Sequence, residues 1–234
     1  MREIIIQNLS LKYDVKEIKN TSIKKYVFST FLDKNFSEKY IYALQNINFN
    51  IKENTILGIY GPNGSGKSSL LKVIAQIAYP TSGKIHIPFS SSFLGSSNFS
   101  FINSATGEEN AMLYLNLKRV DKSLQIDLLN KIFSICKLGK FFHQPVRIYS
   151  SGMLLRLAFA CTEVISSEVL ILDEWISTAD EDMKEYITNT INDKIKKSLI
   201  TVIASHNYEL LKNNCHKIIH LNSGMIIKEE IIKQ

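Results

Sequence analysis

A glycine-rich turn between an apolar strand and a helix constrains the fold of this chain more than any other part of its sequence. The segment GPNGSGKSS at residues 61–69 matches the pattern G-x-x-x-x-G-K-[ST]. It follows the apolar run TILGIY and precedes a helical pattern that continues to about Ile77. Glycines let successive backbone N–H groups turn toward phosphate oxygens, and the positive end of a helix adds to the attraction. The sequence therefore predicts a phosphate-binding loop in an α/β fold.

The chemistry of this loop assigns roles to two side chains. Lys67 is predicted to reach the β- and γ-phosphates of a nucleotide, and the hydroxyl of Ser68 to hold Mg²⁺. The remaining loop residues are expected to contact the nucleotide through backbone and hydroxyl groups. The predicted nucleotide-binding residues of the loop are Gly61, Pro62, Asn63, Gly64, Ser65, Gly66, Lys67, Ser68 and Ser69.

Two later apolar strands end in residues that suit phosphate chemistry. VLILDE ends in Asp173 and Glu174, which point to different sides of a strand end. Asp173 is predicted to be a Mg²⁺ ligand and Glu174 the general base for water. LITVIASH ends in His206, which is expected to sense the γ-phosphate. Taken alone, polar residues at a strand end are typical of a solvent-exposed surface or of a structural role. Because these follow a phosphate-binding loop in the chain, they favour a catalytic site. The predicted catalytic residues are Lys67, Glu174 and His206.

The rest of the chain alternates strands with helices. A short strand is expected at residues 3–7, and another at 46–51, where apolar residues alternate with asparagines. From residue 55 onward, strands and helices follow one another in a way that predicts a mainly parallel sheet with helices on its faces. A closing hairpin is expected around residues 222–224. The expected helices cover residues 67–77, 107–119 and 123–137, with others beginning at Ser150, after Asp180 and after the LITVIAS strand.

Length and composition exclude several classes of protein. The chain has 234 residues, which suits one domain, and a net charge of +6 whose lysines are scattered, so no nucleic-acid partner is expected. No apolar run approaches the ~18 residues that cross a bilayer, and the start carries no signal-peptide pattern. The three cysteines lack metal-site spacing and are expected to be buried thiols in a reducing cytosol.

An amphipathic helix is also expected within residues 20–38. It either covers the sheet or faces a partner or membrane.

One more segment of the chain is suited to binding an anion. YSSGMLLRLAFA begins at Tyr149 and opens a helix with Ser150 and Ser151 as caps, followed by Gly152. Such a helix start presents N–H groups and hydroxyls, although caps are common and the signal alone is weak. Its value comes from its position between the phosphate-binding loop and the VLILDE strand.

The order of these motifs resembles the nucleotide-binding subunits of ABC transporters over essentially the whole chain. GPNGSGKS is similar to their Walker A motif, YSSGM to their signature, and VLILDE to Walker B. TAD, which ends in Asp180, is similar to the D-loop, and Ser205 with His206 to the switch histidine. The resemblance implies ATP and Mg²⁺, and a P-loop NTPase fold with an antiparallel β subdomain and a helical subdomain. It also implies a homodimer in which Ser150, Ser151, Gly152 and Asp180 contact nucleotide.

Three features resemble the polysaccharide-export subfamily, which serves capsule, O-antigen or teichoic-acid transporters. They are YSSGM, the run SATGEEN at residues 104–110 and the early insertion. That implies an ATP-hydrolysing subunit on the cytoplasmic face of the bacterial cell membrane, beside an integral membrane permease that carries the glycan. We expect one nucleotide-binding domain over residues 1–234, with a helical subdomain at about 95–165 and the insertion at about 20–38. No C-terminal carbohydrate-binding domain is expected.

Some features depart from the family pattern. No glutamine occurs between Pro80 and Gly107, where the family has its Q-loop, so that contact has no assigned residue. The aromatic residue that stacks on adenine is expected to be Tyr13 or Tyr42, with Tyr40 a further candidate. Alternatives are an ABC ATPase for a lipid or drug, and a soluble ABC-type regulatory ATPase. A non-catalytic module is disfavoured because the predicted catalytic residues are all present.

Overall fold

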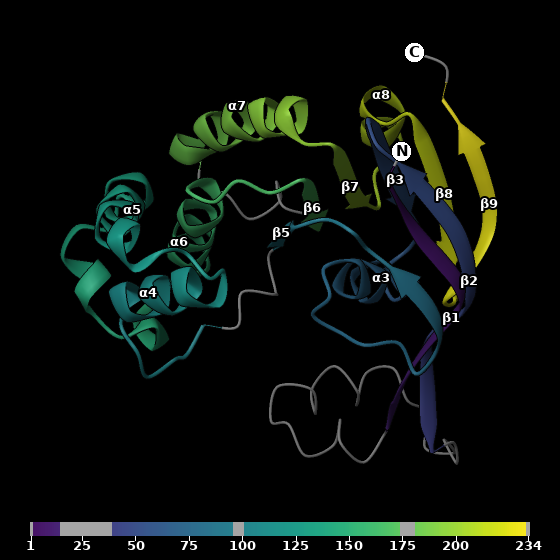
Figure 1. Ribbon diagram of the computed structural model, residues 1–234, viewed down its shortest axis with the longest axis horizontal. Helices are drawn as coiled ribbons and strands as arrows, with labels where there is room; N and C mark the ends of the chain where they lie inside the picture. The colour runs from purple at the N-terminus through teal and green to yellow at the C-terminus, as the bar shows by residue number, and fades with distance from the viewer. Residues whose placement is uncertain (1, 15–38, 96–100, 174–180, 233–234) are drawn as a thin grey trace. The chain divides into compact units, whose positions relative to one another are not determined.

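The computed structural model describes residues 2–14, 39–95, 101–173 and 181–232 (Figure 1). The chain divides into two compact units. The first unit combines Met1–Pro88 with Ala204–Gln234, and the second is Phe89–Ile203. The expected insertion at 20–38, together with Glu174 and Asp180, lies outside the described residues. None of the described helices is long and apolar enough to cross a membrane.

A three-stranded antiparallel sheet forms part of the first unit. Its central strand β1 (Glu3–Asp14) pairs with β2 (Tyr40–Lys52) on one side and with β4 (Ser82–His86) on the other. Both long strands extend further than the sequence pattern predicts. Asn8 and Asn46 have positive φ angles of 49° and 48°, and the β1–β2 register shifts nearby. These irregularities break the alternation of apolar and polar residues, so each pattern reveals only half of its strand.

The first unit also contains β3 (Thr55–Tyr60), which pairs in parallel with β8 (Lys217–Asn222). β8 turns back into β9 (Met225–Ile231), so the expected closing hairpin is confirmed. Two helices belong to this unit, α3 (Lys67–Ile74) and α8 (Tyr208–Asn214).

Helix α3 ends three residues earlier than the sequence predicts. Ala75 is its C-cap, and Gln76 has a φ of 58°, in the left-handed region that commonly ends a helix. Hydrogen bonds from the N–H groups of Ile77 and Ala78 to the carbonyl of Lys72 close the turn. The sequence pattern extends the helix to Ile77 because this residue is apolar and falls at helical spacing. In the structure Ile77 lies beyond the helix and is 54% exposed.

Strands of the second unit include β5 (Ser91–Gly95) and β6 (Val169–Asp173), which pair in parallel, and β7 (Ile200–Ser205) next to β6. All five residues of β6 are buried, as its unbroken apolar run predicts. The last two residues of β7 belong to the first unit. The parallel pairs β3–β8 and β5–β6 confirm the predicted α/β fold with a parallel component.

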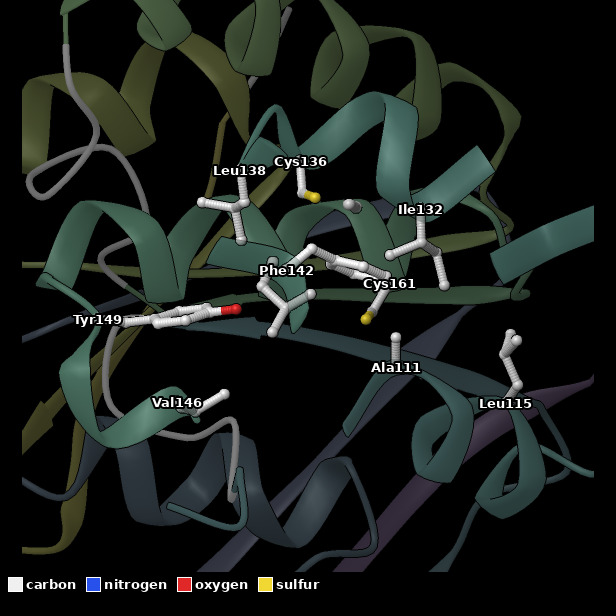
Figure 2. Close-up of a cluster of buried hydrophobic side chains, with 11 residues drawn as sticks. Ala111, Leu115, Ile132, Cys136, Leu138, Phe142, Val146, Tyr149 and Cys161 are labelled. Carbon is white, nitrogen blue, oxygen red and sulfur yellow. The ribbon is translucent and has the colours of Figure 1, made fainter. Parts of the chain in front are cut away.

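Helices make up most of the second unit. They enclose a core in which Phe142 is 2% exposed (Figure 2). The ring of Phe142 also meets that of Phe133 edge to face, with 5.2 Å between ring centroids. The helices are α4 (Gly107–Leu117), α5 (Lys122–Cys136), α6 (Ser151–Glu163) and α7 (Glu181–Lys197), with short turns η1 (Gly139–His143) and η2 (Val146–Ile148). The core cluster consists of Ala111, Leu115, Ile132, Cys136, Leu138, Phe142, Val146, Tyr149, Leu157, Ala160 and Cys161.

Candidate functional site

The phosphate-binding loop joins β3 to α3, in the strand–loop–helix context that its motif requires. Gly66 is the N-cap of α3 and has a φ of 105°, and Gly64 has a φ of 79°. A Cβ on Gly66 would lie 2.5 Å from the carbonyl oxygen of Ala43 in β2. Gly66 therefore needs to be glycine for two reasons, its left-handed backbone and the close approach of a neighbouring strand.

Lys67 lies across the loop. Its side chain is 5% exposed, and its Nζ donates hydrogen bonds to the carbonyl oxygens of Gly61 at 2.9 Å and Pro62 at 3.0 Å. The N–H of Ser65 donates to the same Pro62 carbonyl at 3.2 Å. A buried ammonium group is tolerated when its protons find acceptors, and here two backbone carbonyl oxygens of the loop accept from it. The contacts hold a positive charge against the loop where a phosphate would bind.

The closing hairpin supports the loop from behind. The N–H of Gly224 donates to the carbonyl of Ser65 at 2.9 Å, and the N–H of Gln45 donates to the carbonyl of Gly224 at 2.8 Å. A Cβ on Gly61 would collide with the carbonyl oxygen of Leu221. Sequence reasoning located this hairpin without connecting it to the site, because its contacts with the loop join residues far apart in the chain.

The other loop residues have the exposure that nucleotide binding requires. Pro62, Asn63 and Gly64 are exposed, and Ser68 and Ser69 are half-buried in the first turn of α3. N–H groups in a first turn have no partner within their helix, so they are available to an anion. The buried hydroxyl of Ser65 has no hydrogen-bond partner among the described residues.

His206 and the candidate adenine-stacking tyrosines also belong to the first unit. His206 is exposed directly after β7. Tyr42 in β2 is 52% exposed and directly precedes Ala43, whose carbonyl oxygen approaches Gly66. Tyr13 is half-buried in β1. The ring of Tyr40 has the ammonium group of Lys12 at 4.4 Å from its centroid.

The second unit holds the other predicted groups. Asp173 ends β6 opposite Gly95 and is 4% exposed. Ser150 is the N-cap of α6, and its hydroxyl accepts a hydrogen bond from the N–H of Met153 at 3.2 Å. Ser151 is not a second cap but the first helical residue, exposed, and Gly152 is buried. A helix therefore begins where the sequence predicts it, with Ser150 as its cap.

The sequence profile of the ABC transporter family matches residues 44–177, which is more than half of the chain. The chain belongs to the ABC transporter family. The matched range of this ABC protein includes the loop at residues 61–69, the segment at 149–153 and Asp173. The resemblance that the motif order indicates is confirmed.

Relatives place the ABC protein near polysaccharide-export members of the family. It is 33% identical over 196 residues to the teichoic acids export ATP-binding protein TagH of Bacillus anthracis, covering 84% of this chain and 36% of that protein. It is 30% identical over 236 residues to the O-antigen export system ATP-binding protein RfbE of Yersinia enterocolitica, covering 99% of each. The chain thus spans little more than a third of the teichoic-acid relative and nearly all of the O-antigen relative.

A solved structure shares the fold. The ATP-binding cassette MJ0796, in a dimeric post-hydrolysis state bound to ADP and Pi, superposes with a TM-score of 0.74 at 22% identity. The match covers 99% of both chains. The predicted fold class, an ABC-type P-loop fold with parallel and antiparallel strands and helices, is confirmed.

Proposed function

We propose that this protein is an ATPase subunit that powers export of a polysaccharide or lipid-linked glycan across the cytoplasmic membrane. The observation that carries the ATPase is the phosphate-binding loop. Lys67, the first residue of α3, is buried there, and its ammonium group donates to two loop carbonyl oxygens. The export role rests on relatives named for teichoic-acid and O-antigen export, one of which aligns over 99% of both chains.

The loop binds ATP through backbone N–H groups and one cation. The left-handed backbone at Gly64 and Gly66 allows successive N–H groups of the loop to turn toward one anion. N–H groups of the first turn of α3 add donors and the helix dipole. Lys67 exchanges its carbonyl partners for β- and γ-phosphate oxygens, so its ammonium group needs no new desolvation. Tyr42 or Tyr13 offers a ring for adenine.

The donor set suits Mg²⁺. The hydroxyl of Ser68, half-buried in the first turn of α3, and the buried carboxylate of Asp173 are the hard oxygen ligands that this ion prefers. When bound, Mg²⁺ would neutralise charge that develops on the phosphates. Ser68 and Asp173 hold the ion in this proposal, and Lys67 holds the phosphates.

Hydrolysis needs a base and a second copy of the chain. Glu174 orients or deprotonates the attacking water, and His206 contacts the γ-phosphate. In a homodimer, the second copy contributes its signature, and donors at the start of its α6 stabilise developing charge. The second-copy residues are Ser150, Ser151, Gly152 and Asp180.

We further propose that residues 1–234 form one nucleotide-binding domain whose helical subdomain, at about 95–165, passes closure to an integral membrane permease. α4, α5 and α6 fall within this range. The protein is then peripheral on the cytoplasmic face of the cell membrane, and the permease carries the glycan.

Removing the ammonium group of Lys67 tests the ATPase. Lys67→Ala is expected to lower turnover of the purified protein by ~10²-fold or more, the usual scale for a preorganised charge contact in the transition state. Lys84→Ala, in an exposed lysine of β4, is the matched control and should keep wild-type turnover. Near-normal hydrolysis by Lys67→Ala would show that the loop does not carry the reaction.

The same variant tests export. Cells in which Lys67→Ala replaces the wild-type protein should accumulate a glycan inside, and the wild-type protein should co-purify with a permease from detergent-solubilised membranes. Accumulated lipid or drug without glycan would contradict the proposed substrate. ATPase stimulation by nucleic acid, with no membrane partner, would replace export with a soluble regulatory role.

A further inference from the structure

A network of side chains surrounds Glu230 in the first unit. Tyr208 Oη donates to one carboxylate oxygen of Glu230 at 3.0 Å. The other oxygen lies 3.1 Å from His220 Nε2 and 3.1 Å from Lys228 Nζ. The hydrogen bonds from Lys228, His220 and Tyr208 lower the pKa of Glu230, and the bond to Glu230 raises the pKa of Tyr208. At neutral pH, Glu230 is therefore a carboxylate that accepts from a protonated Tyr208.

Aromatic rings extend this network to the phosphate-binding loop. Tyr60 meets Tyr208 edge to face at 5.5 Å and 72°, and meets His220 at 5.3 Å and 73°. The Tyr208 and His220 rings lie 5.9 Å apart. Tyr60 is the last residue of β3, immediately before Gly61, so the rings pack where the strand enters the loop.

Strand register and a glycine bring these groups together. Tyr60 pairs with His220 across β3 and β8, and His220 pairs with Lys228 across β8 and β9. A Cβ on Gly58 would lie 3.1 Å from Cys215 Sγ, so the absence of a side chain there lets α8 pack closely on β3. Figure 1 shows α8 beside these strands. The close packing places Tyr208, the first residue of α8, against the end of β3.

Tyr208 follows His206 by two residues, and short contacts brace the segment between them. The N–H of Asn207 donates to Ser205 Oγ at 3.0 Å, and Asn207 Oδ1 accepts from the N–H of Leu210 at 3.1 Å. α8 has seven residues, so few internal bonds fix it and its anchors matter more than its helicity. The position of His206 thus depends on where Tyr208 is held.

We propose that Tyr208, held by Glu230 and packed against Tyr60 and His220, is a positioning residue that sets His206 relative to the phosphate-binding loop. This inference rests on the proposed ATPase function. It assigns a role to Glu230 at the far side of the closing hairpin, which the motifs do not include.

The test removes the hydroxyl and keeps the ring. Tyr208→Phe is expected to lower kcat about 10-fold, the scale of a lost hydrogen bond to a charged group, with KM for ATP changed less than about 2-fold. KM should hold because the loop contacts to ATP remain. Tyr79→Phe removes a hydroxyl from a tyrosine that is 83% exposed, and it should behave as wild type. Because the lost bond also stabilises the fold, the urea midpoint of Tyr208→Phe should fall somewhat, so kcat is measured without urea, where the variant is fully folded. A loss in kcat at unchanged KM then reports the position of His206, not unfolding.

Substitutions of Glu230 test whether the network acts as one unit. Glu230→Ala should reproduce the loss in kcat, and Glu230→Gln, which keeps an acceptor oxygen for Tyr208, should recover most of it. The double variant Tyr208→Phe with Glu230→Ala should be no slower than either single variant. Glu229→Ala is the control on the same strand, because Glu229 pairs instead with Lys217 at 2.6 Å.

The outcomes separate this inference from the proposed function. An active wild-type protein whose kcat is unchanged by Tyr208→Phe overturns the positioning role alone. Losses that multiply in the double variant also overturn it. A wild-type protein without ATPase activity overturns the proposed function and this inference with it.

Discussion

Two glycines of the phosphate-binding loop meet different demands at the residue scale. Gly64 and Gly66 both have backbones in the left-handed region, with φ of 79° and 105°. A Cβ on Gly64 would meet nothing within 4 Å, whereas a Cβ on Gly66 would lie 2.5 Å from the carbonyl oxygen of Ala43. The two positions therefore separate the cost of a strained backbone from the cost of a collision.

Alanine at each glycine should measure these costs. Gly64→Ala is expected to lower the free energy of unfolding by about 1 kcal/mol, the strain of a left-handed residue with a Cβ. Gly66→Ala carries similar strain, and its collision with the β2 backbone should add about 1–3 kcal/mol. Urea denaturation of the two variants beside wild type gives both values. Equal losses would mean that β2 does not press on the loop.

At the scale of elements, the start of α4 is held by hydrogen bonds between two nearby residues, one of which is charged. Thr106 is the N-cap of α4, and its Oγ1 accepts from the N–H of Glu109 at 3.1 Å. In return, Glu109 Oε2 accepts from the N–H of Thr106 at 2.7 Å, which completes a capping box. The hydrogen bond from the Thr106 N–H to the carboxylate, and second the one that Thr106 Oγ1 donates to Glu109 Oε2 at 3.1 Å, lower the pKa of Glu109 below its ordinary value of 4.5.

The lowered pKa predicts how the capping box depends on pH. Because the folded pKa of Glu109 lies below the unfolded one, its stabilisation is complete above about pH 4.5 and is lost as the pH falls through the folded pKa. The urea midpoints of wild type and Glu109→Ala should therefore differ at pH 7 and converge toward pH 3. Asp127→Ala, in an exposed carboxylate of α5, is the control. A difference for Glu109→Ala that persists unchanged at low pH would contradict the prediction.

The strand and helix ends show where sequence prediction stops. Ser150 and the hairpin at residues 222–224 are local signals, and the structure has a helix and a turn there. The outer halves of β1 and β2 escaped prediction because Asn8 and Asn46 interrupt the period-two pattern. Pairing with the other strand keeps each strand extended past its irregularity, and a pattern read along one strand does not contain its partner.

At the scale of the whole molecule, all three cysteines are buried. Cys136 and Cys161 lie in the core of the second unit (Figure 2), and Cys215 packs in the first. Burial raises the pKa of all three thiols, that of Cys215 to about 12. The expectation of buried thiols is met in both units.

Thiol alkylation reports on both cores at once. At pH 8 the native protein should resist iodoacetamide, because its thiols are buried and protonated, and protein unfolded in urea should gain three adducts by mass spectrometry. Free glutathione in the same tube checks that the reagent is active. Rapid modification of a cysteine in the native protein would show that one of the cores opens.

The sequence by itself determined the family, the phosphate-binding loop and the order of the strands and helices around it. These follow from local patterns, since a glycine turn, an apolar run or a capping serine acts on its own neighbours in the chain. The tertiary structure decided what holds the loop and its histidine in place. Gly224 beneath Ser65, Ala43 against Gly66 and Glu230 bound to Tyr208 are contacts between distant residues. Such contacts exist only after the strands have paired, because register across a sheet selects which distant residues meet.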